Sequence, residues 1–231
     1  MILPFRPQFW PTLITAFAVA LTLALGIWQV QRLVWKQGLI DRLEQRLVAP
    51  PVSPPPVIDI AAMEYNRVRA EGRFLHQHEI LLIGRTEKGS NGFHVVTPFA
   101  VEGGPVVLVN RGWIPDDRKD PARRPGSRPE GLVTVEGIIR RDAVRGYFTP
   151  PNEPARGFWF TIDAAEIGAF TGLGPLPAYY IDALRQPGPV LPIGADPKIA
   201  LRNEHLQYAI TWFSLAIAGA VIWWLYHRRR P

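Results

Sequence analysis

Two long stretches without a charged side chain are the feature that most limits how this chain can fold. The first lies between Arg6 and Arg32 and is rich in Leu, Ala, Ile, Val and Phe. The second runs from Leu206 to Tyr226 and has a similar composition. About 20 apolar residues are needed to cross a hydrocarbon layer of roughly 30 Å. We therefore predict two transmembrane α-helices, at residues 10–31 and 205–226.

A cleaved signal peptide is the alternative for the first stretch. Its apolar part is too long for one, and the sequence GIWQVQR at its end offers no small-x-small cleavage site. Residues 1–9 leave no room for an Arg- and Ser-rich organelle presequence before the span. We therefore expect a permanent anchor, in a bacterial inner membrane.

The basic sequence HRRR near the end of the chain favours a cytoplasmic tail at residues 227–231. Basic residues after the first span argue weakly for the opposite orientation, but long loops translocate largely regardless of their charge. With two spans, both termini then lie in the cytoplasm. The middle of the chain is expected in the periplasm.

The polar middle of the chain divides at a proline-rich stretch. Residues 32–49 keep a helical spacing of leucines among charges, so the first helix is expected to continue beyond the membrane. The sequence APPVSPPP ends it, because proline lacks an amide hydrogen and restrains the residue before it. Residues 50–57 are then a stiff connector, and residues 58–200 form the extramembrane domain.

Six short runs in this domain have the composition of strands, and only DAAEIGAF looks helical. A hairpin is expected at Glu102–Gly104, between the third and fourth runs. The Arg- and Pro-rich run DDRKDPARRPGSRPEG is expected to be a solvated loop. The pattern predicts a mainly antiparallel sheet, curled into a small barrel or sandwich and flanked by the two spans. The runs are NRVRAEGRF, HEILLIGR, GFHVVTPFAV, PVVLVNRGWI, LVTVEGIIRR and PAYYIDAL.

Composition argues against several functional classes. The formal net charge is +6, but the basic residues are spread over loops and membrane boundaries without a recognition helix, so no nucleic-acid partner is expected. The absence of Cys from the sequence removes disulfides, thiol catalysis and thiolate metal sites. None of the four serines lies in a nucleophile-elbow sequence. A periplasmic enzyme is therefore a less favoured alternative.

Three histidines raise the alternative of a metal site in the β-domain. His76 and His78 alternate in LHQHE, so on a strand they would face one side, and His94 on a later strand could join them. The other interpretation is two solvated imidazoles at the start of a strand. We favour it, because a copper site would also be expected to offer thiolates or thioethers.

A single histidine, His205, stands at the outer boundary of the second span. Trp212 follows seven residues later, which places both side chains on one face of a helix. Anchoring at the interface, or a hydrogen bond to the neighbouring helix, would explain His205. The third explanation is an axial ligand for a planar cofactor in the membrane, with Trp212 packed beneath it.

The outer end of the first span faces the outer start of the second if each helix crosses once. Arg32, Lys36 and Arg202 would then gather near His205. Guanidinium groups bind carboxylates in a bidentate way, and haem carries two propionates. The same cluster could bind anionic lipid headgroups. These residues by themselves indicate a membrane-anchored periplasmic β-domain of assembly or binding type.

Five blocks, in order along nearly the whole chain, resemble the signature sequences of the surfeit locus protein 1 family. Their combination is far more specific than any one of them. The resemblance implies an assembly factor for haem-copper oxidases, chiefly the aa3-type cytochrome c oxidase, and not an enzyme. The blocks are GIWQVQRLVWK, YNRVRAEGRF, NRGWIP, GYFTPPNEP followed by FWFTID, and NEHLQYAITWF.

The resemblance also implies a cofactor and partners. Bacterial members bind haem a and are thought to pass it to oxidase catalytic subunit I, with the residues matching His205 as iron ligand and Trp212 as second determinant. Arg32 and Arg202 would meet the propionates. As a hypothesis, Arg111 and Trp113 would dock the oxidase subunit or the haem a synthase. For Trp113 we favour packing in the core, because a Trp that ends an apolar strand is usually packed. A scaffold that never touches haem is the main alternative, and the client is either a cytochrome c or a quinol oxidase.

Overall fold

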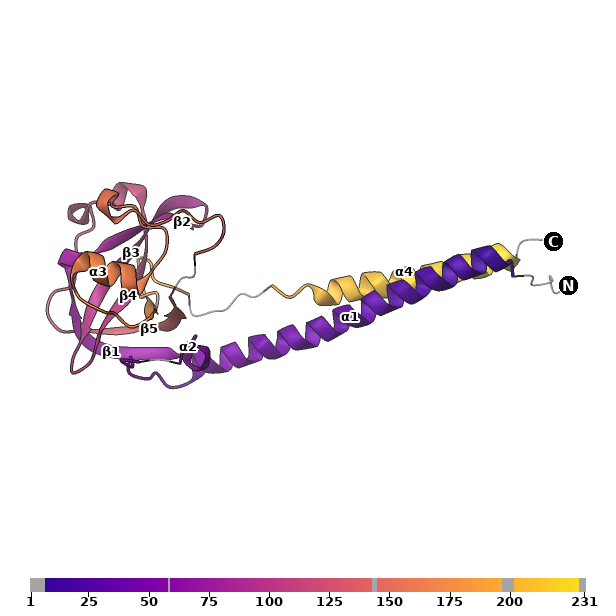
Figure 1. Cartoon of the computed structure of the whole chain (residues 1–231), viewed down its shortest axis with the longest axis horizontal. Helices are drawn as coiled ribbons and strands as arrows, with labels where there is room; N and C mark the ends of the chain where they lie inside the picture. The colour runs from indigo at the N-terminus through magenta and orange to yellow at the C-terminus, as the bar shows by residue number, and fades with distance from the viewer. Residues whose placement is uncertain (1–6, 58, 143–144, 197–201, 229–231) are drawn as a thin grey trace. The chain divides into compact units, whose positions relative to one another are not determined.

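The computed structural model of the chain describes residues 7–57, 59–142, 145–196 and 202–228. It divides into two compact units, residues 1–42 together with 200–231, and residues 43–199. The first unit contains a pair of long helices and the second a β-sheet domain (Figure 1). Predictions for residues 1–6 and 229–231 lie outside the described residues.

Two helices of the first unit are long and apolar enough to cross a membrane. Helix α1 spans Phe9–Val48 and helix α4 spans His205–Arg228. The predicted span at 10–31 and its predicted extension at 32–49 therefore form one continuous helix of 40 residues. Only 6% of the apolar window of α1 and 11% of that of α4 are buried, unlike the core helix of a water-soluble protein.

Helices α1 and α4 run antiparallel and side by side (Figure 1). At one end of their contact, the indole Nε1 of Trp223 donates to Thr12 Oγ1 at 3.0 Å. Further along, Gly26 lies against the ring of Phe213, and a Cβ added to this glycine would come within 2.7 Å of the ring. Glycine therefore permits the close approach, as small residues commonly do between membrane helices.

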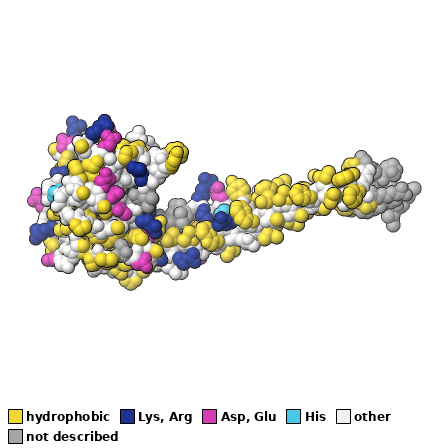
Figure 2. All heavy atoms as spheres, in the orientation of Figure 1, with side chains coloured by type: hydrophobic (Ala, Val, Ile, Leu, Met, Phe, Trp, Pro, Cys, Tyr) yellow, Lys and Arg dark blue, Asp and Glu magenta, His cyan; other side chains and the backbone are white. Residues whose placement is uncertain are grey.

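Apolar side chains make up much of the face of the helix pair that Figure 2 shows. Phe17, Ile14 and Ile222 are 70%, 64% and 66% exposed. The polar side chain of Gln29 is instead 9% exposed. On a helix pair in water, apolar side chains face inward and polar side chains face outward. The opposite distribution here suits helices that are surrounded by lipid hydrocarbon.

Six strands of the second unit form one sheet in the order β1-β5-β6-β4-β3-β2. Their pairings are antiparallel except that of β4 with β6, which is parallel. Strands β3 and β4 form the hairpin predicted at Glu102–Gly104. Each strand coincides with one predicted run. Their bounds are Arg67–Phe74 (β1), Ile80–Glu87 (β2), Ser90–Val101 (β3), Val106–Pro115 (β4), Val133–Arg141 (β5) and Tyr179–Ala183 (β6).

A further pairing between β1 and β3 closes the sheet on itself. Strands β1, β5, β6, β4 and β3 form a ring, and β2 pairs with the first part of β3. One apolar core contains side chains from all five ring strands, with Phe99, Val107 and Tyr179 fully buried. The predicted fold class, two membrane helices flanking a mainly antiparallel domain of barrel or sandwich type, is confirmed.

A second core lies under helix α3 (Ala164–Thr171), which the run DAAEIGAF predicted. Ile167 of this helix packs with Leu82 of β2 and Leu108 of β4. The Asp163 carboxylate starts the helix by accepting the amide hydrogen of Glu166 at 2.9 Å. The shorter helical segments are α2 (Ile60–Met63), η1 (His76–His78), η2 (Asp116–Arg118), η3 (Pro121–Arg123) and η4 (Pro154–Arg156).

The Arg- and Pro-rich run at residues 116–131 differs from its prediction. The prediction of a solvated loop is wrong at Arg124 and Ser127, which are each only 3% exposed. The physical reason is the carboxylate of Glu79, which pairs with the Arg124 guanidinium. A buried charge is stable when it is paired and hydrogen-bonded. That partner lies 45 residues earlier in the sequence, beyond the reach of any local pattern.

Candidate functional site

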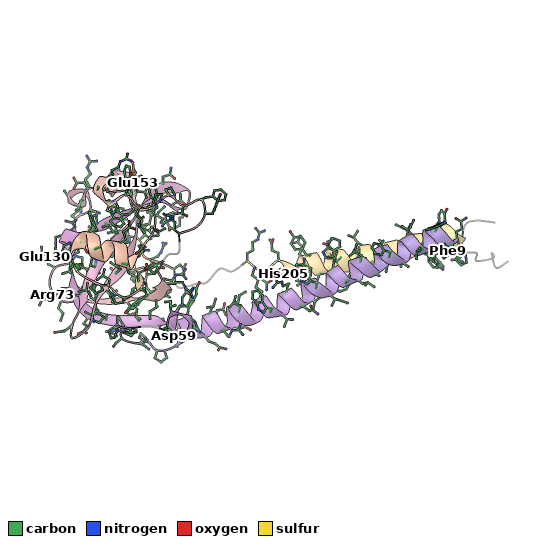
Figure 3. All side chains as sticks on the ribbon, viewed as in Figure 1. Phe9, Asp59, Arg73, Glu130, Glu153 and His205 are labelled. Carbon is green, nitrogen blue, oxygen red and sulfur yellow. The ribbon has the colours of Figure 1, made fainter. Side chains whose placement is uncertain are left out.

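His205 is the first residue of α4 and lies beside α1 (Figure 3). Its imidazole Nδ1 is 2.7 Å from Oε1 of Gln29, on α1. His205 is half-buried and Gln29 is nearly fully buried. A buried amide between apolar helices is stabilised when a polar group on the other helix pairs with it. The contact therefore joins the two helices at this end, as the hydrogen-bond explanation of His205 expects.

The same contact fixes which nitrogen of His205 carries the hydrogen. The side-chain oxygen of Gln29 can only accept, so Nδ1 must donate. In the neutral ring Nε2 then carries a lone pair. No described residue hydrogen-bonds this nitrogen. Histidines that bind metals in proteins have this arrangement, with one ring nitrogen held by a protein oxygen and the other on the metal.

Trp212 lies on the same side of α4 as His205. Ala209 and Ala216 are 2% and 3% exposed and mark the side of α4 that packs against α1. Trp212 is half-buried between them along the helix. His205, Ala209 and Trp212 follow one another at helical spacing along the side of α4 that carries the buried alanines. The packing of Trp212 beneath a cofactor stays a prediction.

Two predicted cations also lie at this end of the helix pair. Lys36 Nζ donates to the backbone oxygen of Arg202 at 2.6 Å. The Arg202 guanidinium pairs with the Glu204 carboxylate, and its side chain is 85% exposed. Because the pair is exposed, little free energy holds it together. The guanidinium can therefore exchange Glu204 for another carboxylate at low cost.

Asn203, two residues before His205, carries a buried side-chain amide. Its Nδ2 and Oδ1 are both shielded from solvent, and neither has a hydrogen-bond partner among the residues that the structure describes. An unpaired buried polar group costs about 1–3 kcal/mol. The amide therefore offers an unused donor and an unused acceptor two residues before His205 in the sequence.

Arg32 is an exposed residue of α1. Its guanidinium stacks on the rings of Trp28 and Trp35, at 5.7 and 5.3 Å from their centroids. Both indoles are about half exposed, at 47% and 57%. Such cation–π contacts at exposed positions contribute roughly 0.5–1 kcal/mol each. A ligand that recruited the Arg32 guanidinium would therefore have to replace contacts of this size.

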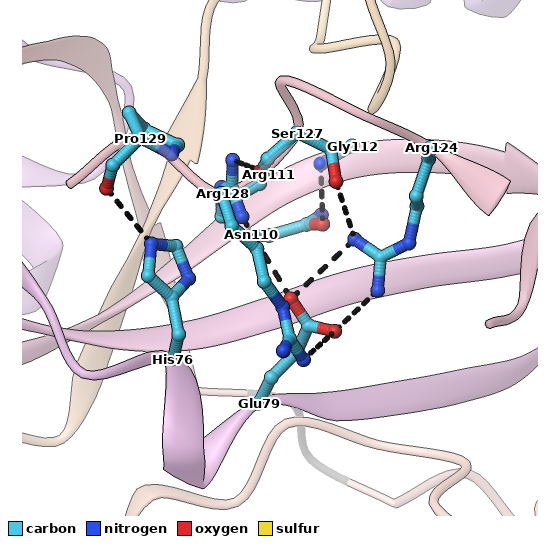
Figure 4. A network of polar contacts seen from close by, with 9 residues as sticks. All are labelled: His76, Glu79, Asn110, Arg111, Gly112, Arg124, Ser127, Arg128 and Pro129. Atoms are coloured by element: carbon cyan, nitrogen blue, oxygen red, sulfur yellow. Dashed lines mark hydrogen bonds and ion pairs between the residues drawn. The ribbon is translucent and has the colours of Figure 1, made fainter. Parts of the chain in front are cut away.

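Arg111, predicted to dock a partner, is held inside the β-domain (Figure 4). Its guanidinium donates to the backbone oxygen of Ser127, lies 3.7 Å from the Glu79 carboxylate and stacks over the ring of Phe74. The side chain is 9% exposed. Fully buried Arg124 pairs with the same carboxylate. The cluster ties β4 to the loop that follows it, so Arg111 has a packing role whether or not it also supports docking.

The charges of this cluster shift the pKa values of its members. Burial by itself would raise the pKa of the Glu79 carboxyl, but hydrogen bonds and charges from Arg124 and Arg128 outweigh it and lower this pKa. Burial lowers the pKa of Arg111 to about 10, against the opposing charge of Glu79. The guanidinium therefore remains charged at neutral pH.

Trp113 is also buried, at 7% exposed. Its backbone exchanges two hydrogen bonds with Ile193, at 2.8 and 2.9 Å. Its indole Nε1 lies 3.4 Å from the backbone oxygen of Arg85. These contacts favour the core alternative for Trp113. A docking function for Trp113 and Arg111 stays a prediction, and either residue would exert it from beneath the surface.

The three histidines of the β-domain are not arranged as a metal site. His76 and His78 lie in the η1 turn and not on a strand, and His76 Nε2 lies 2.9 Å from the Pro129 oxygen. His94 on β3 instead contacts Asn110 at 3.1 Å. Within the described ranges, no group of three or more His, Asp or Glu side chains could hold a metal ion.

Two polar residues of the helix-pair site were not predicted. Gln29 and Asn203 both lie within blocks that the sequence singles out, GIWQVQRLVWK and NEHLQYAITWF. The signal for Gln29 was an amide close to the end of an apolar stretch, where each polar side chain needs a partner. The sequence gives no signal that Asn203 is buried.

The chain is similar to proteins of animals. To Surfeit locus protein 1 of Homo sapiens it is 37% identical over 217 residues, which cover 86% of this chain and 71% of the human protein. To Surfeit locus protein 1 of Mus musculus it is 35% identical over 230 residues, covering 92% and 74%. To a SURF1-like protein of Drosophila melanogaster it is 36% identical over 225 residues, covering 89% and 73%.

A family model described as SURF1 family matches residues 16–217. The matched range includes most of α1, the whole β-domain and the first turns of α4, which carry His205 and Trp212. The resemblance seen in the sequence blocks is thereby confirmed, and the chain belongs to the SURF1 family.

Proposed function

We propose that this protein is a membrane-anchored assembly factor for haem-copper oxidases of the aa3 type. It binds haem a at the His205 end of its helix pair and assists haem insertion into oxidase catalytic subunit I. Family membership supports the assembly role. The observation that carries the haem part is the 2.7 Å contact between His205 Nδ1 and Gln29 Oε1, which leaves Nε2 as a ligand nitrogen.

The residues at this end of the helix pair fit haem a. Haem a, when bound, would supply an iron that accepts a nitrogen ligand. It also carries two carboxylates and a long apolar tail. His205 offers the nitrogen, the exposed guanidinium of Arg202 suits a carboxylate, and Asn203 has an unused donor. The apolar outer surface of α1 and α4 lets an apolar tail remain in lipid, away from water.

An assembly factor must also release its ligand. His205 is half-buried, and the ion pair of Arg202 is on the surface, so this site is open. Arg32 would add a second guanidinium after leaving Trp28 and Trp35. We place the helices in a bacterial inner membrane with both termini in the cytoplasm. The β-domain would then meet the oxidase subunit or the haem a synthase in the periplasm.

A scaffold that stabilises an oxidase intermediate without binding haem is the second candidate. The contact between His205 and Gln29 also favours it, because a hydrogen bond between the helices stabilises their pairing without any ligand. The two candidates differ in what His205 does. The carrier needs the imidazole Nε2, and the scaffold needs only Nδ1.

Purification of the full chain from cells that make haem a separates the candidates. For the carrier, we expect the protein to show a haem a absorption spectrum, and His205→Ala to lose it together with oxidase activity in the membranes. His78→Ala, in the η1 turn of the β-domain, is the matched control and should keep both. A colourless wild-type protein whose His205→Ala variant still supports oxidase assembly would leave the scaffold as the function.

A further inference from the structure

We propose that Gln29 is a positioning residue for His205. Its amide oxygen holds the imidazole as the Nδ1–H tautomer and so presents the bare Nε2 to a metal. The identity of that metal as haem iron rests on the proposed function. The tautomer itself is a property of the ligand-free chain and can be tested separately.

Gln29 is well placed for this role because its helix is fixed against α4. Gly26, one turn earlier on α1, packs directly on Phe213 of α4. At the far end of the contact, Trp223 donates to Thr12. The amide oxygen of Gln29 is therefore carried on a rigid element, and its near-complete burial excludes water as a competing partner.

The chemistry of imidazole makes such a partner matter. A neutral imidazole in water mostly carries its hydrogen on Nε2, the nitrogen that a metal needs to find bare. An acceptor at Nδ1 reverses this preference before any ligand arrives. Partners of this kind also raise the basicity of the ligand nitrogen, and their loss typically weakens metal binding about 10- to 100-fold.

Gln29 could instead serve only to join the helices, and three substitutions distinguish the roles. Gln29→Leu removes the acceptor while keeping a side chain of similar size. Gln29→Glu keeps an oxygen acceptor at the same position and serves as the rescue variant. Gln31→Leu is the matched control, because Gln31 is exposed and lies only two residues further on the same helix.

The first measurement uses the full chain without haem, in lipid nanodiscs with ¹⁵N-labelled histidine. The ring nitrogens of His205 are assigned from their loss in His205→Gln. We expect a protonated Nδ1 and a bare Nε2 in the wild type and in Gln31→Leu, a protonated Nδ1 in Gln29→Glu, and a shift toward Nε2–H in Gln29→Leu. A wild-type ring that carries its hydrogen on Nε2, or an unchanged tautomer in Gln29→Leu, would overturn the proposal.

The second measurement uses haem a added to the same proteins. We expect Gln29→Leu to bind it about 10- to 100-fold more weakly than Gln31→Leu. The iron–histidine stretching frequency should rise in Gln29→Glu, because a carboxylate makes the ring a stronger donor. A stretching frequency that is the same in all variants would contradict positioning. A wild type that binds no haem would refute the proposed function, while the tautomer would still decide the role of Gln29.

Discussion

At the scale of single residues, the buried amide of Asn203 leaves two polar atoms without a partner among the described residues. Its two unpaired polar atoms destabilise the ligand-free protein. We predict that Asn203→Leu leaves the free energy of unfolding unchanged or raises it by up to about 1 kcal/mol, because an apolar side chain has nothing to pair. The same substitution should weaken haem a binding. Thermal unfolding in micelles and a haem titration measure the two effects.

The control for Asn203 is Gln207→Leu, which changes an exposed side chain of α4. It should alter neither stability nor affinity. If Asn203→Leu proved less stable than wild type by more than about 1 kcal/mol, the amide would have an unrecognised partner in the fold. The interpretation as an unused ligand contact would then be wrong.

His94 makes the β-domain sensitive to acid. Burial lowers the pKa of its imidazole to about 4, the charge of Arg85 adds to the effect, and Glu87 opposes it. In the unfolded chain the imidazole of His94 binds a proton as the pH falls through about 6.5. In the folded chain it binds a proton only near pH 4. The contribution of His94 to the free energy of unfolding is therefore fully present above pH 6.5 and is lost progressively as the pH drops below that value. We predict a loss of about 1–2 kcal/mol between pH 7 and pH 5.

The variant His94→Gln isolates this contribution. Its amide oxygen can still accept from Asn110, but it cannot titrate. Unfolding followed by tryptophan fluorescence at both pH values should show a smaller decrease for this variant than for wild type. His78→Gln, at another histidine of the β-domain, should behave as wild type does. An equal decrease in His94→Gln and wild type would mean that other groups cause the acid sensitivity.

The position of a functional side chain could be predicted where it depends only on residues nearby in the sequence. The positions of His205 and Trp212 on one side of a helix followed from their spacing. The partner of His205 did not, because Gln29 lies 176 residues away and only helix packing brings it near. Arg111 shows the same limit, since its burial depends on Glu79 and on a loop that closes over both.

At the scale of secondary-structure elements, the contact of α1 with α4 depends on Gly26. A side chain there would overlap the ring of Phe213. We predict that Gly26→Val separates the helices near His205. Because the sequence lacks Cys, a disulfide between Val19→Cys and Gly219→Cys reports the packing, since a Cβ on Gly219 would lie 3.4 Å from Val19. Its yield on oxidation should fall severalfold in Gly26→Val.

Gly38→Val is the control for this experiment. It lies on the same helix, but a Cβ there meets only the end of the Arg42 side chain, at 3.9 Å. The disulfide should form in this variant as it does without the extra substitution. Equal yields in Gly26→Val would show that the helices pack in another register, and the pairing of His205 with Gln29 would lose its basis.

Elements were predicted better than their arrangement. All six strands, helix α3 and the β3–β4 hairpin follow from alternation and turn residues, which are short-range properties. The closure of β1 on β3 and the parallel pairing of β4 with β6 do not. Those pairings are decided by a shared core, to which Phe99 and Tyr179 contribute from distant parts of the chain.

At the scale of the whole molecule, the antiparallel helices determine on which side of a membrane each part lies. The ends of α1 and α4 near Thr12 and Trp223 face one side, and His205 lies at the other end of their contact. In the sequence, the β-domain lies between the end of α1 at residue 48 and residue 202, which comes shortly before α4. If both helices cross the membrane, the chain leaves α1 and returns to α4 on the side that carries His205, and we expect the β-domain on that side in whichever orientation the protein inserts.

We predict that this side is the periplasm. Two single-cysteine variants test it, Gln8→Cys just before α1 and Glu102→Cys in the exposed β3–β4 turn, since the sequence has no other thiol. A membrane-impermeant maleimide should label Glu102→Cys in cells with a permeabilised outer membrane and Gln8→Cys only after lysis. The reverse pattern would place His205 at the cytoplasmic surface. Haem delivery to the oxidase would then have to start from that surface, although the geometry of Gln29 and His205 would be unchanged.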